Sequence, residues 1–267
     1  MLYAAVAGAG GRMGQAIIGA MLKNSSFMLS GAVERDDSAF IGRDAGEAFG
    51  EKTGVKITEA RDRAFKKADV IIDFSTPDAT MKNLEECVGL KKAIVIGTTG
   101  FSHIQRDAIR ELGPKTRVVI SPNMSIGVNL LLKLVEEAAT VLGKDYDIEI
   151  TEWHHRHKKD APSGTAARIA EVIAGALNRD IEKAAVYERK GITGERTPDE
   201  IGIQSIRAGD IVGDHTVLFG GIGERLEITH RASSRDTFAF GALRAALWVA
   251  DRPNGIYDMQ DVLGLKG

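Results

Sequence analysis

The chain has 267 residues, enough for two domains of ordinary size and for a core that needs no disulfide or metal. Its 35 basic and 37 acidic residues nearly balance, which argues against nucleic acid as a partner, because such domains usually carry a basic excess. The single cysteine, Cys87, cannot form an internal disulfide, so we expect a cytoplasmic protein. No stretch reaches the ~20 apolar residues that span a bilayer, and we expect neither a signal peptide nor a membrane partner.

In the first half, short apolar runs alternate with segments whose apolar residues recur at helical spacing. Residues 36–56 are rich in glycine and aspartate, and we expect a loop there with a short helical piece. Near-continuous apolar strands between helices predict a Rossmann-type, doubly wound parallel sheet, and thus an α/β fold. The predicted strands are Leu2–Ala7, Phe27–Val33, Asp69–Phe74, Ala93–Ile96 and Arg117–Ile120; the predicted helices are Arg12–Leu22, one starting near Pro77, and residues 103–112.

The pattern changes near Pro122, after which several strands alternate polar and apolar residues with period two. This alternation predicts a second, α+β domain with a mixed or antiparallel sheet. We expect a last helix, Arg235–Ala250, to return to the first domain, so that the domains are residues 1–122 with 235–267, and residues 123–234. The predicted elements are helices at 127–142 and Thr165–Leu177 and strands around Ile148, Ile203–Ala208, Asp214–Phe219 and Glu224–His230; the last helix has Phe238, Leu243, Leu247 and Trp248 as core positions.

A glycine-rich segment, Gly8-Ala9-Gly10-Gly11-Arg12-Met13-Gly14, joins the first predicted strand to the first helix. In a dinucleotide-binding turn, such glycines allow the tight turn, the approach of a pyrophosphate and close packing of helix on strand. The spacing departs from the usual fingerprint, because Met13 stands where the third glycine would fall. Glu34 ends the second predicted strand, 20 residues past Gly14, and this context favours a nucleotide site over a plain glycine turn.

Glu34 is suited to bind the ribose hydroxyls of NADH, and Arg35 beside it is suited to the 2′-phosphate of NADPH, so we expect NADH, NADPH or both. The ends of the later parallel strands meet at the same edge and should also contact the cofactor; Ser75-Thr76-Pro77 lies at that edge too. The predicted cofactor-binding residues are Gly8, Ala9, Gly10, Gly11, Arg12, Met13, Glu34, Arg35, Gly97, Thr98, Thr99, Ser121, Pro122, Asn123 and Met124.

The run His154-His155-Arg156-His157-Lys158-Lys159 is a metal site, a basic surface loop or a catalytic cluster. We predict no metal, because the neighbouring cations repel one and no H-E-x-x-H motif or cysteine partner is present. Adjacent cations lower one another's pKa, as proton transfer near neutral pH requires. Ser163-Gly164-Thr165 then starts a helix, whose free N–H groups bind anions. Together these features favour catalysis on a small acidic substrate.

The segment Glu152-Trp153-His154-His155-Arg156-His157-Lys158-Lys159-Asp160-Ala161-Pro162-Ser163-Gly164-Thr165-Ala166 resembles the signature of the dihydrodipicolinate reductase (4-hydroxy-tetrahydrodipicolinate reductase) family of lysine biosynthesis. The resemblance covers nearly the whole chain. It includes the glycine loop, Asp73-Phe74-Ser75, Gly97-Thr98-Thr99-Gly100, Arg207-Ala208-Gly209 and Glu224-Arg225-Leu226-Glu227-Ile228-Thr229-His230.

The resemblance implies an oxidoreductase that reduces a cyclic pyridine dicarboxylate with NADH or NADPH, in the diaminopimelate route. It implies that His154 is the proton donor or acceptor, and that Lys158 is a second proton donor. It assigns the substrate to His155, Gly164 and Thr165. It further implies a homotetramer built by pairing the sheets of the second domain, which is then the substrate-binding and oligomerisation domain, with closure of the two domains around the substrate.

Two other functions stay open on the sequence. One is another two-domain NAD(P)-dependent dehydrogenase, of the sugar or homoserine type, which shares the first domain but not the histidine-rich run. The other is a nicotinamide-sensing protein without chemistry of its own, which would normally carry a DNA-binding segment. The sequence does not decide between NADH and NADPH.

Overall fold

The computed structural model describes residues 1–266, which divide into two compact units. The first comprises Met1–Ile126 and the described residues from Arg235 onward, and the second comprises Gly127–Ser234. The first unit extends beyond the boundary expected at residue 122. Met124 is 1% exposed and belongs to the first unit's core, where its carbonyl lies against Gly241. Because Met124 packs in this core, the boundary of the first unit lies after residue 122.

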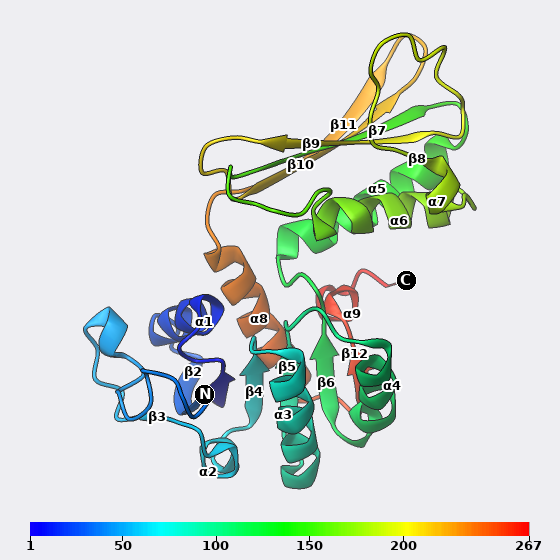
Figure 1. The fold of residues 1–267 in the computed structure, drawn as a ribbon. Helices are drawn as coiled ribbons and strands as arrows, with labels where there is room; N and C mark the ends of the chain where they lie inside the picture. The colour runs from blue at the N-terminus through cyan, green and yellow to red at the C-terminus, as the bar shows by residue number, and fades with distance from the viewer. Residues whose placement is uncertain (267) are drawn as a thin grey trace. The chain divides into compact units, whose positions relative to one another are not determined.

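The first unit is built on a seven-stranded parallel sheet with the order β12-β6-β5-β4-β1-β2-β3 (Figure 1). The order reverses between β1 and β4, where ligands of such sheets bind at the carboxyl ends of the strands. This confirms the predicted Rossmann-type sheet. The strands are β1 (Leu2–Ala7), β2 (Phe27–Val33), β3 (Ile57–Thr58), β4 (Val70–Asp73), β5 (Ala93–Ile96), β6 (Arg117–Ile120) and β12 (Gly255–Tyr257).

Helices cover both faces of this sheet. On one face α1 (Arg12–Leu22), α8 (Asp236–Val249) and α9 (Met259–Leu263) share a core cluster with β1 and β2. On the other face lie α2 (Arg61–Lys66), α3 (Pro77–Leu90) and α4 (His103–Leu112). Local signals start two of them: Thr76 caps α3 ahead of a proline, and Ser102 forms a capping box with Gln105 at α4. Short 3-10 turns occur at η1 (Glu47–Phe49) and η2 (Gly113–Lys115).

Helix α8 packs through small residues. Its buried positions include Ala239, Gly241, Ala242, Ala245 and Ala246, which let the helix approach α1 and the sheet closely. The predicted core position Leu243 is buried, but the prediction for Leu247 is wrong, since Leu247 is 42% exposed. The alanine face already fills the contact, so this larger side chain falls outside it.

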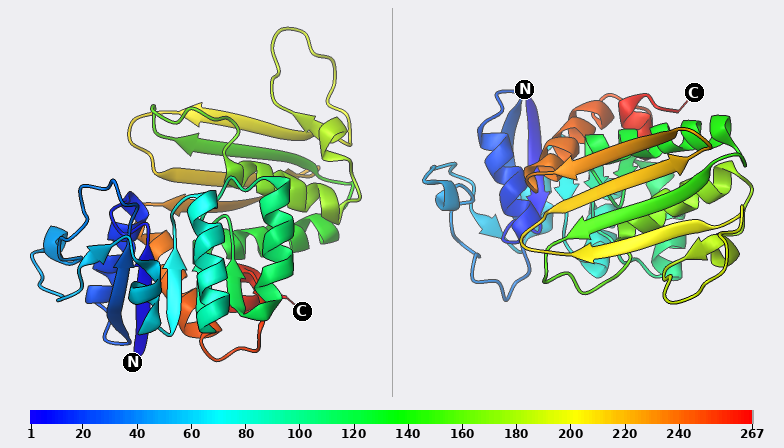
Figure 2. Two further views of the ribbon diagram at one scale, coloured as in Figure 1. Left: turned by 60° about the horizontal axis from the view of Figure 1, so that its bottom comes forward. Right: turned by 90° about the horizontal axis from the view of Figure 1, so that it is seen from above.

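The second unit has a mixed five-stranded sheet with the order β11-β10-β7-β9-β8, as the alternation predicted. Strand β10 pairs antiparallel with β11 and with β7, whereas β9 pairs parallel with β7 and with β8. Helices α5 and α6 pack on one face only (Figure 2, right). The strands are β7 (Asp147–His154), β8 (Ala185–Val186), β9 (Ile201–Arg207), β10 (Gly213–Gly220) and β11 (Arg225–Ala232); the helices are α5 (Ile126–Leu142), α6 (Gly164–Ala176) and α7 (Ile181–Ala184).

The described chain, residues 1–266, holds no helix with both the length and the apolar character needed to cross a bilayer.

Candidate functional site

The glycine loop of the first unit needs its glycines for space as well as for backbone conformation. Gly8 has φ +76°, and a Cβ there would lie 2.8 Å from the carbonyl oxygen of Phe74. A Cβ on Gly14 would lie 2.0 Å from the Gly8 carbonyl oxygen, inside the strand-to-helix contact. Helix α1 starts after Gly11 with no side-chain cap. Its first-turn N–H groups are therefore available to an anion.

Glu34 follows β2 and faces this loop. Its Oε2 accepts the N–H of Gly10 at 2.8 Å. Arg35 points into solvent, where its Nε lies 3.0 Å from Asp37 Oδ1, with side-chain exposures of 75% and 68%. The glutamate predicted to bind the ribose is thus hydrogen-bonded to the glycine loop. The arginine predicted to bind the 2′-phosphate has a carboxylate partner, Asp37, of its own.

A cavity of about 290 Å³ in the first unit gathers six of the predicted cofactor residues. They come from the start of α1 and from the chain after β5 and β6, whose carboxyl ends meet at one edge. Thr98 and Ser121 are buried beside these strand ends and do not line the cavity. The lining residues are Arg12, Met13, Gly97, Pro122, Asn123 and Met124 from the prediction, with Phe74, Arg235 and Phe238 in addition.

A buried carboxylate that was not among the predicted site residues forms a hydrogen-bond network at the same edge of the sheet. Asp73 ends β4, and its Oδ1 accepts the backbone N–H of Ser75 at 2.9 Å and the Ser75 hydroxyl at 2.6 Å. Its Oδ2 accepts from Asn83 of α3 at 2.9 Å. Burial raises the pKa of Asp73, although these hydrogen bonds oppose the shift. Thr98 joins the network by accepting from Thr80 at 2.9 Å.

In the second unit, His154 is the last residue of β7 and is 9% exposed. Its Nδ1 contacts Glu152 Oε2. Arg207 of β9 donates to both oxygens of Glu152, at 2.9 Å and 2.8 Å, and the backbone N–H of Ser163 donates to Oε1 at 3.1 Å. Burial alone would raise the pKa of Glu152, but the hydrogen bonds from Arg207 and His154 outweigh it and hold this pKa at about 2.

A second histidine lies against the first. The rings of His154 and His215 are 5.3 Å apart in a T-shaped arrangement. Burial lowers the pKa of His154, against the effect of Glu152, and burial lowers the pKa of His215 to about 4. The Nε2 of His215 lies 3.0 Å from the hydroxyl of Ser163, which also caps α6 by accepting from Ala166 N–H at 3.1 Å.

The remaining predicted site residues follow His154 closely. Lys158 Nζ lies 2.9 Å and 2.8 Å from the two oxygens of Asp160. His155 Nδ1 is buried without a hydrogen-bond partner among residues 1–266. Gly164 and Thr165 form the first turn of α6, and the space at the Gly164 Cα is open. Within the described residues, no three His, Cys, Asp or Glu side chains are arranged to hold a metal.

Two family models match the two units in turn. "Dihydrodipicolinate reductase, N-terminus" matches residues 3–124, and "Dihydrodipicolinate reductase, C-terminus" matches residues 127–263. The 4-hydroxy-tetrahydrodipicolinate reductase of Syntrophotalea carbinolica is 52% identical over 267 residues, covering 100% of both chains.

Solved structures agree with this relationship. The dipicolinate-bound dihydrodipicolinate reductase of Paenisporosarcina sp. TG-14 has a TM-score of 0.80 and 26% identity, covering 98% of this chain and 99% of the other. A probable dehydrogenase of Thermotoga maritima has a TM-score of 0.62 at 11% identity, covering 98% and 92% of the two chains. The second likeness shows the shared fold alone.

Proposed function

Because the chain belongs to the dihydrodipicolinate reductase family, we propose that it reduces 4-hydroxy-tetrahydrodipicolinate to tetrahydrodipicolinate with NADH or NADPH, in the diaminopimelate route to lysine. The observation that carries this function is the 52% identity over the full length of both chains. Neither a sugar or homoserine dehydrogenase nor a non-catalytic sensor accounts for a match of this extent in both units.

The cofactor belongs, in this proposal, to the first unit. The start of α1 has no side-chain cap and is suited to a pyrophosphate, and the cavity at the strand ends is suited to the nicotinamide. A nicotinamide held there would supply a hydride. The proposed contacts are Gly8, Ala9, Gly10, Gly11, Arg12, Met13, Glu34, Arg35, Gly97, Thr98, Thr99, Ser121, Pro122, Asn123 and Met124.

The substrate is a small dicarboxylate, in keeping with the dipicolinate bound to the Paenisporosarcina relative. We place one carboxylate at Gly164 and Thr165 in the first turn of α6, at the positive end of the helix dipole. His155, whose Nδ1 lacks a hydrogen-bond partner among residues 1–266, is the proposed third contact.

Reduction makes the ring electron-rich, so a proton must be delivered to it. We assign this proton to His154 and a second proton-donating role to Lys158. Bound carboxylates would raise the pKa of His154 and so favour its protonated form. Two N–H groups of the Lys158 ammonium donate to the oxygens of Asp160 here, and its third N–H remains for the substrate.

The test supplies freshly generated 4-hydroxy-tetrahydrodipicolinate and follows the loss of reduced-nicotinamide absorbance. We expect turnover with at least one of the two cofactors. His154→Gln and Lys158→Ala should each lower kcat by about 100- to 10,000-fold, the usual contribution of a positioned acid or base. The absence of wild-type turnover with either cofactor would contradict the proposed function, and unchanged turnover in both variants would contradict the assigned roles.

We further propose a cytoplasmic homotetramer that pairs the open faces of the mixed sheet, with residues 123–234 binding substrate and building the oligomer. The open face carries the intermediate and exposed residues that alternate with the core along β7 and β10, which supports this assembly. Sedimentation analysis of the full chain should give four times the 28.7 kDa chain mass. A monomer at micromolar concentration would contradict it.

A further inference from the structure

One buried carboxylate of the second unit joins the parts of the proposed substrate site. Glu152 contacts His154 Nδ1 through Oε2 and the backbone N–H of Ser163, the residue that caps α6, through Oε1. Arg207 binds both oxygens from the neighbouring strand. Arg207 also donates to the carbonyl of Asp160 at 2.7 Å, inside the loop that separates β7 from α6. Glu152 is therefore held by contacts from its own strand, from β9 and from the start of α6.

This arrangement determines which nitrogen of His154 carries a hydrogen. Glu152 is ionised at neutral pH, because its pKa is about 2. An ionised carboxylate only accepts hydrogen bonds, so the hydrogen shared with it belongs to His154 Nδ1. Nε2 is then the nitrogen that gains and loses a proton.

The surroundings of Nε2 leave it free for that exchange. No residue in the described part of the chain forms a hydrogen bond with Nε2. The backbone of β10 passes beside it at Gly213, where a Cβ would lie 3.0 Å from Nε2. A glycine at this position keeps a side chain away from the reacting nitrogen.

We propose that Glu152 and Arg207 form a positioning pair that fixes His154 in a single tautomer and orientation, with Nε2 as the atom that delivers the proton. The inference rests on the role proposed above for His154. In the step, the imidazolium gives its Nε2 proton to the ring and becomes neutral. The hydrogen on Nδ1 stays bonded to that nitrogen and hydrogen-bonded to Glu152, which remains ionised throughout. Solvent then restores the proton to Nε2.

Four charged or titratable groups surround His154, and they act in different directions. Glu152 on its own strand raises the pKa of His154, whereas Lys158 after the strand and Arg207 on β9 lower it. His215 on β10 stays neutral at neutral pH, because burial lowers its pKa to about 4. Removing the charge of Glu152 should therefore lower the pKa of His154, and removing that of Arg207 should raise it.

The experiment compares wild type with Glu152→Gln, Arg207→Gln and the double variant, by measuring kcat, KM and the pH profile of kcat/KM. The protonated form of His154 is the active one, so activity is lost as pH rises through its pKa. In Glu152→Gln this alkaline limb should move to lower pH, and kcat should fall about 100-fold with less than about a threefold change in KM. In Arg207→Gln the limb should move to higher pH.

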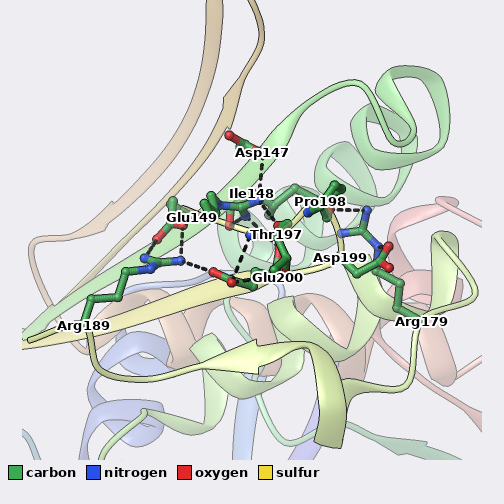
Figure 3. A network of polar contacts seen from close by, with 10 residues as sticks. Asp147, Ile148, Glu149, Arg179, Arg189, Thr197, Pro198, Asp199 and Glu200 are labelled. Carbon is green, nitrogen blue, oxygen red and sulfur yellow. Dashed lines mark hydrogen bonds and ion pairs between the residues drawn. The ribbon is translucent and has the colours of Figure 1, made fainter. Parts of the chain in front are cut away.

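A second glutamate on β7 provides a matched control (Figure 3). Glu149 points to the opposite face of the sheet and pairs with Arg189 through two contacts of 3.0 Å and 2.9 Å. Glu149→Gln removes the same charge from the same strand, also from a paired arginine. It should leave the pH limb and kcat as in wild type.

The double variant separates positioning from stability. It removes the buried, unpaired carboxylate that Arg207→Gln leaves at Glu152, so its melting temperature should recover from that of Arg207→Gln toward wild type. Its kcat should stay about 100-fold low. Recovery of kcat together with stability would reduce the pair to a structural role and overturn the inference. Wild-type turnover with an unmoved limb in Glu152→Gln contradicts the positioning role alone, whereas an inactive wild type contradicts it together with the proposed function.

Discussion

Two glutamates, one in each unit, lie at or near the end of a strand and serve opposite kinds of site. Glu34 is partly exposed and accepts from the N–H of Gly10 and, at 3.1 Å, from the N–H of Arg35. Glu152 is fully buried and is bound by His154, Arg207 and Ser163. The first belongs to a site made mainly of backbone, and the second to a site made of charged side chains.

The difference predicts how each site fails. A backbone site depends on side-chain atoms being absent, so an added methyl group is the most damaging small change. A site of buried, paired charges depends on every partner being present, because one unpaired buried charge costs several kcal/mol.

Among changes to the backbone site of the first unit, the largest effect is expected for Gly14→Ala. The new Cβ would lie 2.0 Å from the carbonyl oxygen of Gly8, a backbone atom that cannot move aside alone. Helix α1 must then shift away from β1, which displaces the N–H groups at its start. We expect kcat/KM for the nicotinamide cofactor to fall about 100-fold, and the unfolding free energy to fall by about 1–3 kcal/mol.

Gly89→Ala is the control for this variant. Gly89 also lies in a helix, α3, but nothing approaches the position of its Cβ within 4 Å. The substitution should leave kcat/KM unchanged and stabilise the protein by up to about 1 kcal/mol, since alanine favours helix. Equal losses in both variants would contradict the argument from close packing.

The second unit should lose stability in mild acid. Burial lowers the folded-state pKa of His215 to about 4, below its ordinary value of 6.5. Such a group stabilises the fold at pH values above 6.5, and this contribution is lost as pH falls from 6.5 toward 4. Its full size is on the order of 3 kcal/mol. Burial also lowers the pKa of His154 and His230, which act in the same direction.

The two tryptophans allow this loss to be assigned, since Trp153 lies in the second unit and Trp248 in the first. Urea unfolding followed through Trp153, in a Trp248→Phe background, should show less stability at pH 5 than at pH 7. His215→Gln should remove most of this pH dependence, whereas the exposed-helix control His103→Gln should keep it. If the unfolding free energy of His215→Gln still falls as much as that of wild type between pH 7 and pH 5, a group other than His215 causes the acid sensitivity.

The same contrast explains what the sequence could predict. The glycine loop and the alternation of strands with helices are local patterns, so the first unit's parallel sheet and six of the nine residues that line its cavity could be predicted from them. Glu152 and Arg207 are 55 positions apart and meet only through the pairing of β7 with β9. No local sequence pattern predicts such a contact. Both residues nevertheless lie within segments that carry the family resemblance. Helix α2 was not predicted, because a helix of six residues with only two buried positions shows no clear helical spacing of apolar residues.

A moderate effect is expected for Glu34→Gln. The charged acceptor proposed for a ribose hydroxyl is lost, and such hydrogen bonds contribute about 1.5–3 kcal/mol. KM for NADH should therefore rise about tenfold or more. KM for NADPH should change less than about threefold, because a 2′-phosphate gains nothing from a neighbouring carboxylate. The measurement is the KM of wild type and variant for each cofactor in steady-state kinetics. Equal increases in the two KM values would contradict the ribose contact.

The smallest effect is expected for Asp37→Asn, which acts on charge at the edge of the backbone site. Asp37 pairs with Arg35 at 3.0 Å, and both side chains are largely exposed. Exposed pairs contribute at most about 1 kcal/mol, so releasing Arg35 should lower KM for NADPH only about two- to threefold and leave KM for NADH unchanged. High salt should abolish the difference. A shift larger than tenfold would mean that charged side chains, and not only backbone, determine cofactor choice in the first unit.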